Sequence, residues 1–414
     1  MTSHEGDRGP LKPRRFGFRS DLHRPDTGEN ADRVGYMELF FDLAFVYAIT
    51  AQAELLSHHL QVQTLVATVV IGVAIWWTWI STAWVTNWLD PNTWPVRSLL
   101  IALMAASLIL SGTIGDALTE RAPAFAITLV VVNIGRPLFA VFALRRTRPA
   151  DAANFTNLSV WSLLSAPLWI VGAYSGNPLT WWVGAVVLDL LGPLTRFSVP
   201  GLGRTPLHTW RIRGAHLAER VSLFVLIALG EAIALIGENV AEIDGHPSRI
   251  ASLAAAFAYT VLLWFLYFNH GESLGSEKIK DTDATGAIAR NTYSYTAALL
   301  VIGIVLGAVA TQVSFEQAVS TTTSTWAAGL LVGATIVCLA GNLLFRLSLQ
   351  DAPIVSHLIA IVIAAAVFPL HAVIPTVVLE WAVVAILAVV VIADDVSARR
   401  SVRGKPVQTN EPAI

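Results

Sequence analysis

Long apolar stretches alternate with short polar links along most of the chain. A helix that crosses the bilayer's hydrocarbon core, which is about 30 Å thick, needs roughly 20 mostly apolar residues. The stretches that approach this length are 34–56, 64–89, 96–115, 123–144, 155–174, 178–195, 214–239, 250–270, 287–310, 324–345, 353–370 and 374–393. This pattern predicts an all-α fold, a polytopic transmembrane helix bundle of about 12 spans.

The basic residues are distributed unevenly over the links between the stretches. Of the 27 Lys and Arg residues, 23 lie in the two tails and in every second link. The remaining links hold Arg121 and Arg249, and the last two, Arg136 and Arg220, lie within spans. Cytoplasmic loops carry an excess of Lys and Arg. We therefore expect a multi-pass protein of the inner (plasma) membrane with both termini cytoplasmic.

The order of the spans predicts a domain organisation. Residues 1–33 and 397–414 are polar, and we expect them to be disordered cytoplasmic tails, because they bury too little apolar surface to offset ordering. The transmembrane domain is then 34–396. Its first and seventh spans both open with an acid, and its second and eighth both end in aromatic runs. This favours a 6+6 parallel repeat with halves 34–195 and 214–396, with chance similarity between apolar helices as the alternative.

Composition narrows the function classes. The chain is 55% hydrophobic and only 14% charged, and its net charge of −2 excludes the general electrostatic footprint of a nucleic-acid binder. The links between spans are too short for a soluble catalytic domain. The histidines do not supply the three or more convergent ligands that zinc requires, and no phosphate loop or dinucleotide fingerprint is present. We expect no metal and no cofactor; the expected partners are the lipid bilayer and a small molecule or ion.

Ionisable groups inside spans mark the candidate site, because each costs roughly 2.5–3.5 kcal/mol at a helix centre. Glu38 and Asp42 are four residues apart and share a helix face, so they need a cation, which Arg136 or Arg220 would supply. Glu231 has no predicted partner, as is common for a proton or cation site. The alternative is a buried ion-pair network that only fixes helix registry. The binding or coupling candidates are Glu38, Asp42, Arg136, Asp189, Glu219, Arg220 and Glu231.

The same segments carry a family resemblance. The motifs are Glu38-Leu-Phe-Phe-Asp42-Leu with Phe45-Val46, Asp189-Leu-Leu-Gly-Pro193, His216-Leu-Ala-Glu-Arg220 with Leu229-Gly-Glu231, and Trp264-Phe-Leu-Tyr-Phe268. They resemble, in the same order, the motifs of the low-temperature-requirement A (LtrA) family of bacterial membrane proteins. The resemblance implies a polytopic bacterial membrane protein linked by name to growth in the cold. It implies no reaction.

Three functions remain open at this point. The first is a secondary transporter or permease in which buried carboxylates couple substrate movement to protons. The second is a membrane-embedded enzyme or binding protein that acts on a lipid or a lipophilic metabolite, with paired carboxylates as acid and base. The third is a structural or sensory membrane protein. The sequence names neither the substrate nor the oligomeric state.

The distribution of basic residues yields a topology prediction. Reporter fusions at Gly176 and Gly245 should report a periplasmic location, and a fusion at Gly203 a cytoplasmic one, because the link around Gly203 holds four basic residues, at positions 196, 204, 211 and 213. Paired alkaline phosphatase and green fluorescent protein fusions measure both locations. A periplasmic Gly203 would show that the predicted spans between residues 145 and 215 are wrong.

Overall fold

The computed structural model describes residues 21–24, 33–205, 212–269, 285–349 and 355–403. Within these ranges the chain is almost entirely helical and contains no β-strand beyond two isolated bridges. The helices of the first half are α1 (Tyr36–Leu43), α2 (Val46–His58), α3 (Val62–Trp88), α4 (Trp94–Thr113), η1 (Ile114–Asp116), α5 (Ala122–Leu144), α6 (Pro149–Tyr174) and α7 (Pro178–Leu194). Those of the second are α8 (Gly214–Ala241), α9 (Pro247–Phe268), α11 (Thr285–Ile288), η3 (Ala289–Thr296), α12 (Ala297–Glu316), α13 (Thr325–Ser348), α14 (Val355–Val367), η4 (Phe368–Ala372) and α15 (Thr376–Arg403).

The predicted fold class is confirmed. In the described part of the chain, 11 helical segments are long and apolar enough to cross a membrane. The stretch predicted at 178–195 forms α7, whose 17 residues lie at the short end of the range for a spanning helix. Large apolar side chains cover the outside of the bundle, including Phe142, Val362 and Val389, each more than 60% exposed. Lipid tails would surround these side chains.

Two of the spans are irregular. The first is interrupted at Ala44–Phe45, which separate α1 from α2 directly after Asp42. The ninth begins with the π-helix η3 before it continues as α12. Single π-helical turns frequently mark functional sites, because they free backbone groups for other partners. Here the carbonyl of Ser294 accepts a hydrogen bond from the Trp76 indole at 2.8 Å.

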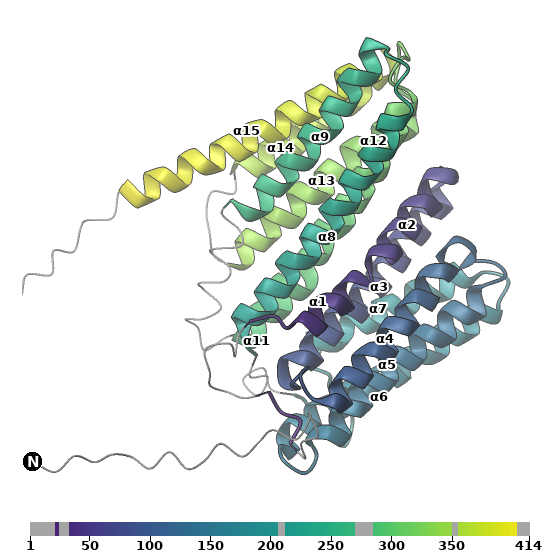
Figure 1. The fold of residues 1–414 in the computed structure, drawn as a ribbon, viewed down its shortest axis with the longest axis vertical. Coiled ribbons are helices and arrows are strands. Elements are labelled where there is room, and N and C mark those ends of the chain that lie inside the picture. Colours follow the sequence, from purple (N-terminus) through teal and green to yellow (C-terminus); the bar gives the residue numbers. More distant parts are fainter. Residues whose placement is uncertain (1–20, 25–32, 206–211, 270–284, 350–354, 404–414) are drawn as a thin grey trace, which may run out of the picture.

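The helices form two groups, α1–α7 and α8–α15, which diverge from each other in Figure 1. Corresponding helices pack against each other within the two groups. The pairs α4–α5, α5–α6, α6–α7, α2–α4 and α3–α7 have as their counterparts α12–α13, α13–α14, α14–α15, α8–α12 and α9–α15. The division into halves at 34–195 and 214–396 stays a prediction, and this shared packing supports it.

Between the two groups, α2 and α3 pack against α8 and α12. Helix α12 is the most enclosed span and packs tightly on α13 through small residues. A Cβ added at Gly341 would lie 3.0 Å from the backbone nitrogen of Leu300, and one at Gly303 would lie 2.5 Å from Sγ of Cys338. Close backbone approach of this kind is how helices associate in lipid, where no hydrophobic effect drives them together.

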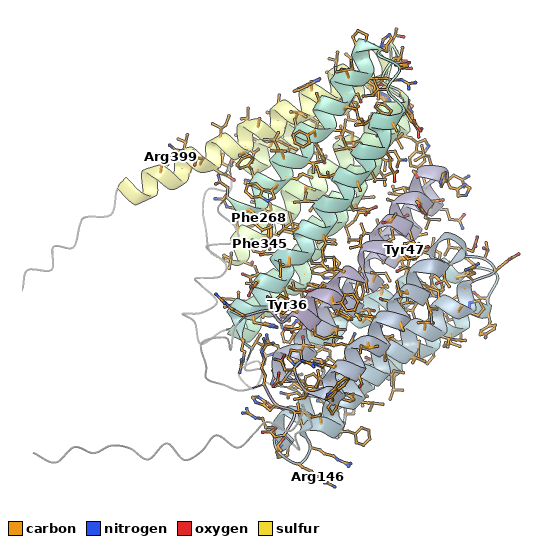
Figure 2. The ribbon with its side chains drawn as sticks, viewed as in Figure 1. Tyr36, Tyr47, Arg146, Phe268, Phe345 and Arg399 are labelled. Carbon is orange, nitrogen blue, oxygen red and sulfur yellow. The ribbon has the colours of Figure 1, made fainter. Side chains whose placement is uncertain are left out.

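The structure describes parts of both predicted tails. Residues 21–24 were expected to be disordered, but the backbone N–H of Arg24 donates to the Trp88 carbonyl at 2.8 Å, and that of Asp90 donates to the Leu22 carbonyl at 2.9 Å. The end of α3 thus supplies partners that composition does not reveal. Helix α15 also continues to Arg403 rather than ending at residue 396. Figure 2 shows Arg399 on the part of α15 that projects from the bundle. Residues 1–20, 25–32 and 404–414 lie outside the described residues.

The contact at Gly341 predicts a stability difference between two alanine variants of α13. Gly341→Ala should lower the free energy of unfolding by about 1–3 kcal/mol, because the new methyl group meets backbone that cannot rotate away. Gly333→Ala lies on the same helix and meets nothing within 4 Å, so it should be neutral or slightly stabilising. Thermal unfolding of both purified variants in detergent measures the difference. Equal melting temperatures would contradict the tight packing of α12 on α13.

Candidate functional site

Helices α1, α3 and α8 enclose a group of buried charges where the two halves meet, here called the interface cluster. Its members are at most 6% exposed, and they are Arg24, Glu38, Asp42, His216 and Arg220. Glu38 and Asp42 come from α1, and His216 and Arg220 from α8. Because positions four apart in a helix share a face, the two acids of α1 meet the two bases of α8 in register. The cluster thereby joins the first span of each half.

Arg220 and Asp42 form the centre of this cluster. The guanidinium contacts both carboxylate oxygens, with Nε donating to Oδ2 at 3.3 Å and Nη2 donating to Oδ1. Trp79 of α3 donates its indole N–H to the same Oδ1 at 2.7 Å. The remaining Arg220 nitrogen, Nη1, donates to the Thr86 hydroxyl at 2.9 Å. The guanidinium also lies 5.7 Å from the ring centre of Phe41, within cation–π range.

Glu38 accepts hydrogen bonds from three directions. The backbone N–H of Gly35 donates to Oε2 at 2.9 Å and caps the start of α1. His216 Nε2 lies 3.0 Å from Oε1. The guanidinium groups of Arg220 and Arg24 lie 3.7 and 3.4 Å from Oε1. A buried carboxylate with this many donors is stable as an anion.

Arg24 closes the cluster from outside the spans. Its Nη1 donates to the Thr86 carbonyl at 3.1 Å, and its Nη2 donates to the Arg33 carbonyl at 2.7 Å. Desolvation lowers the pKa of Arg24 from its ordinary value, and the attraction of Glu38 opposes that shift. The segment that precedes α1 is therefore fastened to the ends of α1 and α3 by a single buried cation.

The surroundings of His216 fix the role of one of its two ring nitrogens. The Arg213 backbone N–H donates to Oδ1 of Asn87 at 2.7 Å, which fixes the amide and directs its Nδ2 toward Nδ1 of His216 at 3.3 Å. Nδ1 must then accept, whereas Nε2 has two neighbours with opposite needs: Glu38 Oε2 at 3.1 Å accepts a proton from it, and Arg24 Nη1 at 2.8 Å donates to it. An imidazolium would place a second N–H against the Asn87 amide. With His216 neutral, two arginines balance two carboxylates, and the cluster has no net charge.

The predicted pairing of Arg220 with Glu38 and Asp42 is therefore present, whereas the other candidates lie elsewhere. Arg136 and Asp189 line a cavity bounded by helices of the first half and by η3, and they form no ion pair with each other. Glu219 is exposed and accepts the Val34 backbone N–H at 3.3 Å. Thus the set of seven residues divides into an interface cluster, a cavity pair and two separate acids.

Glu231 is buried on α8, 11 residues beyond Arg220 and so about 16 Å further along the same face of that helix. It faces the Thr50 side chain of α2, and Glu54 and Glu238 are near enough to repel it. No ion pair includes Glu231 among the residues that the structure describes. Both Glu54 and Glu238 are exposed. A series of carboxylates thus leads from the far end of the interface toward the cluster.

Several buried ionisable residues were not predicted from the sequence. Arg24 lies in a segment whose composition predicts a disordered tail. Asp394 follows the predicted end of the twelfth span, yet its carboxylate lies 2.5 Å from Arg346 Nη1. Glu380 lies inside that span, is 3% exposed and accepts the Ser252 hydroxyl at 2.7 Å. Glu380 could have been identified from the sequence, because it is an acid within an apolar stretch. Nothing in the sequence around Arg24 indicates that this residue is buried.

Comparisons with known proteins agree with the motifs. The family model described as bacterial low temperature requirement A protein (LtrA) matches residues 33–392. The chain is similar to an uncharacterised protein of Rhizobium meliloti (strain 1021), with 35% identity over 350 residues, which cover 83% of this chain and 84% of the relative. No solved structure matches the chain significantly.

The central ion pair predicts a large loss of stability when one partner is removed. Arg220→Met should lower the free energy of unfolding by about 3–5 kcal/mol, because it leaves the Asp42 carboxylate buried without a cation. Arg249→Met is the control, since Arg249 pairs with the exposed Asp244 near a loop and should change stability by less than about 1 kcal/mol.

The double variant Asp42→Asn/Arg220→Met should be more stable than Arg220→Met alone, because it removes both charges together. Thermal unfolding of the wild type, Asp42→Asn, Arg220→Met and the double variant in detergent measures the coupling. Additive effects of the two substitutions would contradict the pairing.

Proposed function

The chain belongs to the bacterial low temperature requirement A family of membrane proteins, and from that premise we propose that it is a proton-coupled secondary transporter of the plasma membrane. Its termini face the cytoplasm, and its two six-span halves move against each other. The interface cluster acts as the gate at the cytoplasmic end, and Glu231 is the residue that takes up and releases the proton. The observation that carries this proposal is the placement of Glu231 on the interface, on the same face of α8 as the closed ion pair of Arg220.

The contacts between the halves support relative movement. They are made mainly by α2 and α3 on one side and by α8 and α12 on the other, with α1 joined to α8 through the cluster and η3 packed against α3 and α7. Transporters built from repeats move in this way, as largely rigid halves that rock around a central site. The equivalent helix pairs in the two halves support the repeat.

The charges at the interface support a gate at the end of the interface where the cluster lies. At one end, five buried residues form a neutral cluster that closes the gap between α1, α3 and α8. Three turns further along α8, Glu231 has Thr50 as its neighbour and faces no cation in the described residues. Intramembrane acids without a counter-ion are commonly proton or cation sites. Opening the cluster would need Asp42 and Arg220 to separate, which ties access at that end to movement of the halves.

The two other functions make different demands on the structure. An enzyme that used paired carboxylates would need two of them on one cavity, and the cavity of the first half has Asp189 as the one acid among its described lining residues. A structural or sensory protein would need the interface cluster but would not need Glu231. Glu231 therefore separates transport from a purely structural role.

The proposal predicts that Glu231→Gln folds normally and is inactive. Gln resembles the protonated acid, and with no ion pair to lose the variant should melt within about 2 °C of the wild type. It should fail to restore growth in the cold to a strain that lacks the gene. Glu242→Gln is the control, because Glu242 is an exposed acid directly after the same helix, further along the chain from Glu231 than Glu238 is, and the variant should restore growth.

A second measurement tests the gate without a known substrate. In a background without Cys338, cysteine introduced at Thr50 should react with a membrane-impermeant thiol reagent from the periplasmic side. Weakening the cluster by Asp42→Asn should slow this reaction, because the halves would then close at the outer end. A Glu231→Gln protein that still restores growth, or a labelling rate that Asp42→Asn leaves unchanged, would refute the proposal.

A further inference from the structure

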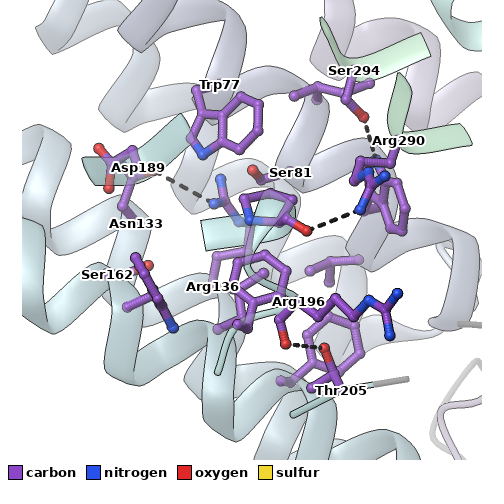
Figure 3. Close-up of a pocket in the computed structure, with 18 residues that line it drawn as sticks. Trp77, Ser81, Asn133, Arg136, Ser162, Asp189, Arg196, Thr205, Arg290 and Ser294 are labelled. Carbon is purple, nitrogen blue, oxygen red and sulfur yellow. Dashed lines mark hydrogen bonds between the residues drawn. The ribbon is translucent and has the colours of Figure 1, made fainter. Parts of the chain in front are cut away.

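A cavity that shares no lining residue with the interface cluster lies between helices of the first half and η3. Its space, counted together with the open solvent at its mouth, is about 910 Å³, and its walls are α3, α5, α6, α7, η3 and the segment from Arg196 to Thr205. Five aromatic residues line it, and they are Trp77, Trp84, Phe155, Trp161 and Phe197. Figure 3 shows Arg136 at its centre, with Asp189 and Asn133 on one side and Arg290 and Ser294 on the other. Three arginines and one acid among the lining residues make the cavity cationic.

The Arg136 guanidinium is an incompletely satisfied charge in this cavity. It is 2% exposed, and its hydrogen bonds go to neutral acceptors, the Thr78 carbonyl at 2.7 Å, the Thr82 hydroxyl at 3.2 Å and the Asn133 amide oxygen at 3.5 Å. Its Nε has no partner in the described structure. Asp189 attracts it through space but does not reach ion-pair distance, and the Asp189 carboxylate accepts the Trp169 indole N–H at 3.3 Å. A buried cation without a contacting anion is costly.

The second half contains the corresponding pair in a closed form. Arg346 is the twenty-second residue of α13 and Asp394 the nineteenth of α15. Arg136 is the fifteenth residue of α5 and Asp189 the twelfth of α7, which are the equivalent spans of the first half. Counted from the start of its helix, each member of the second-half pair lies seven residues, about two helical turns, further along than its first-half counterpart. The two members of each pair therefore keep the same register relative to each other.

In the closed pair, the carboxylate of Asp394 lies 2.5 Å from Arg346 and occupies the position of an anionic partner. In the first half, the cavity is present and this contact is missing. The comparison indicates what Arg136 lacks. An oxyanion beside its guanidinium would complete the arrangement that Asp394 completes in the second half.

We propose that this cavity is a binding site for a small organic oxyanion, a carboxylate or a phosphate ester, with an apolar body. The oxyanion pairs with Arg136, and the apolar body packs against Trp77, Trp84 and Trp161. Asp189 accepts a hydrogen bond from an ammonium or hydroxyl group where the ligand has one. Arg196 and Arg290 line the same cavity and raise the local concentration of anions. Binding here does not require the transport cycle proposed above, so the two proposals can fail separately.

Four probes with one phenyl body and different head groups test the site. They are 3-phenylpropionate, phenylalanine, phenethylamine and 3-phenylpropanol, titrated into the full-length protein in neutral detergent and followed by thermal unfolding. The propionate and phenylalanine should stabilise the protein by mass action, whereas the amine and the alcohol should not, because only the first two carry a carboxylate for Arg136.

Variants of the cavity separate binding from partition into the micelle. Arg136→Gln should weaken binding of 3-phenylpropionate by about tenfold or more, through loss of a charge-assisted contact. Arg145→Gln, an exposed arginine on the inner side next to α5, is the matched control and should bind as the wild type does. Asp189→Asn should weaken the binding of phenylalanine and leave the binding of 3-phenylpropionate unchanged. If Arg136→Gln does not fold, Ser162→Phe fills the cavity with Arg136 intact and should abolish binding.

A short-chain phosphatidylglycerol serves as a further probe for the source of the oxyanion. Stabilisation by this lipid that is lost in Arg136→Gln supports the oxyanion site and assigns the ligand to the bilayer, while stabilisation by the propionate alone assigns it to a soluble metabolite. Equal affinity of the wild type, Arg136→Gln and Ser162→Phe for every probe would overturn the proposal, as would stabilisation by the amine and the alcohol to the same extent as by the anions.

Discussion

Charge balance in a medium of low dielectric is the constraint on which the arrangement of the two halves depends. Glu38 and Asp42 cannot both remain ionised in the interior of a helix bundle unless cations reach them. Arg220 comes from the other half and Arg24 from the segment before α1, so neutrality is reached only when three parts of the chain meet. The cluster therefore does more than fix helix registry: it makes the contact between the halves at this end of the interface a requirement for burying the acids.

The two halves resolve the same problem differently. In the second half, Arg346 and Asp394 neutralise each other directly, and His357 lies 3.8 Å from the same carboxylate. In the first half, the corresponding Arg136 and Asp189 are held apart by their neighbours, with Asp189 bound to Trp169 and Arg136 bound to α3. If the halves arose by duplication, one copy of the pair, Arg346 and Asp394, stabilises the bundle as an ion pair. The other copy, Arg136 and Asp189, is open and can pair with a ligand. This division of roles resembles that of repeat transporters, whose binding sites lie at discontinuities in the helices.

The sequence predicts the fold far better than the site. Span length and the distribution of arginines predict a helical bundle, because every backbone group in lipid must be satisfied within a helix. The pairing of Arg220 with Glu38 and Asp42 also follows, since a helix places positions four apart on one face. Arg24 could not be predicted, because its burial depends on the Thr86 carbonyl at the end of α3. Neither could the cavity, because the separation of Arg136 from Asp189 depends on how the aromatic rings of three helices pack.

Helix α3 connects the two candidate sites. Thr78, Thr82 and Thr86 recur every four residues and so form one stripe along this helix. The first two accept hydrogen bonds from Arg136 in the cavity, and the third accepts one from Arg220 in the interface cluster. A ligand that draws the Arg136 guanidinium toward itself competes with Thr78 and Thr82 for its donors. Any resulting shift of α3 along its axis also moves Thr86 relative to Arg220. If the two proposals hold, occupancy of the cavity and closure of the gate act on the same rigid element, and binding in the cavity would then bias the contact between the halves.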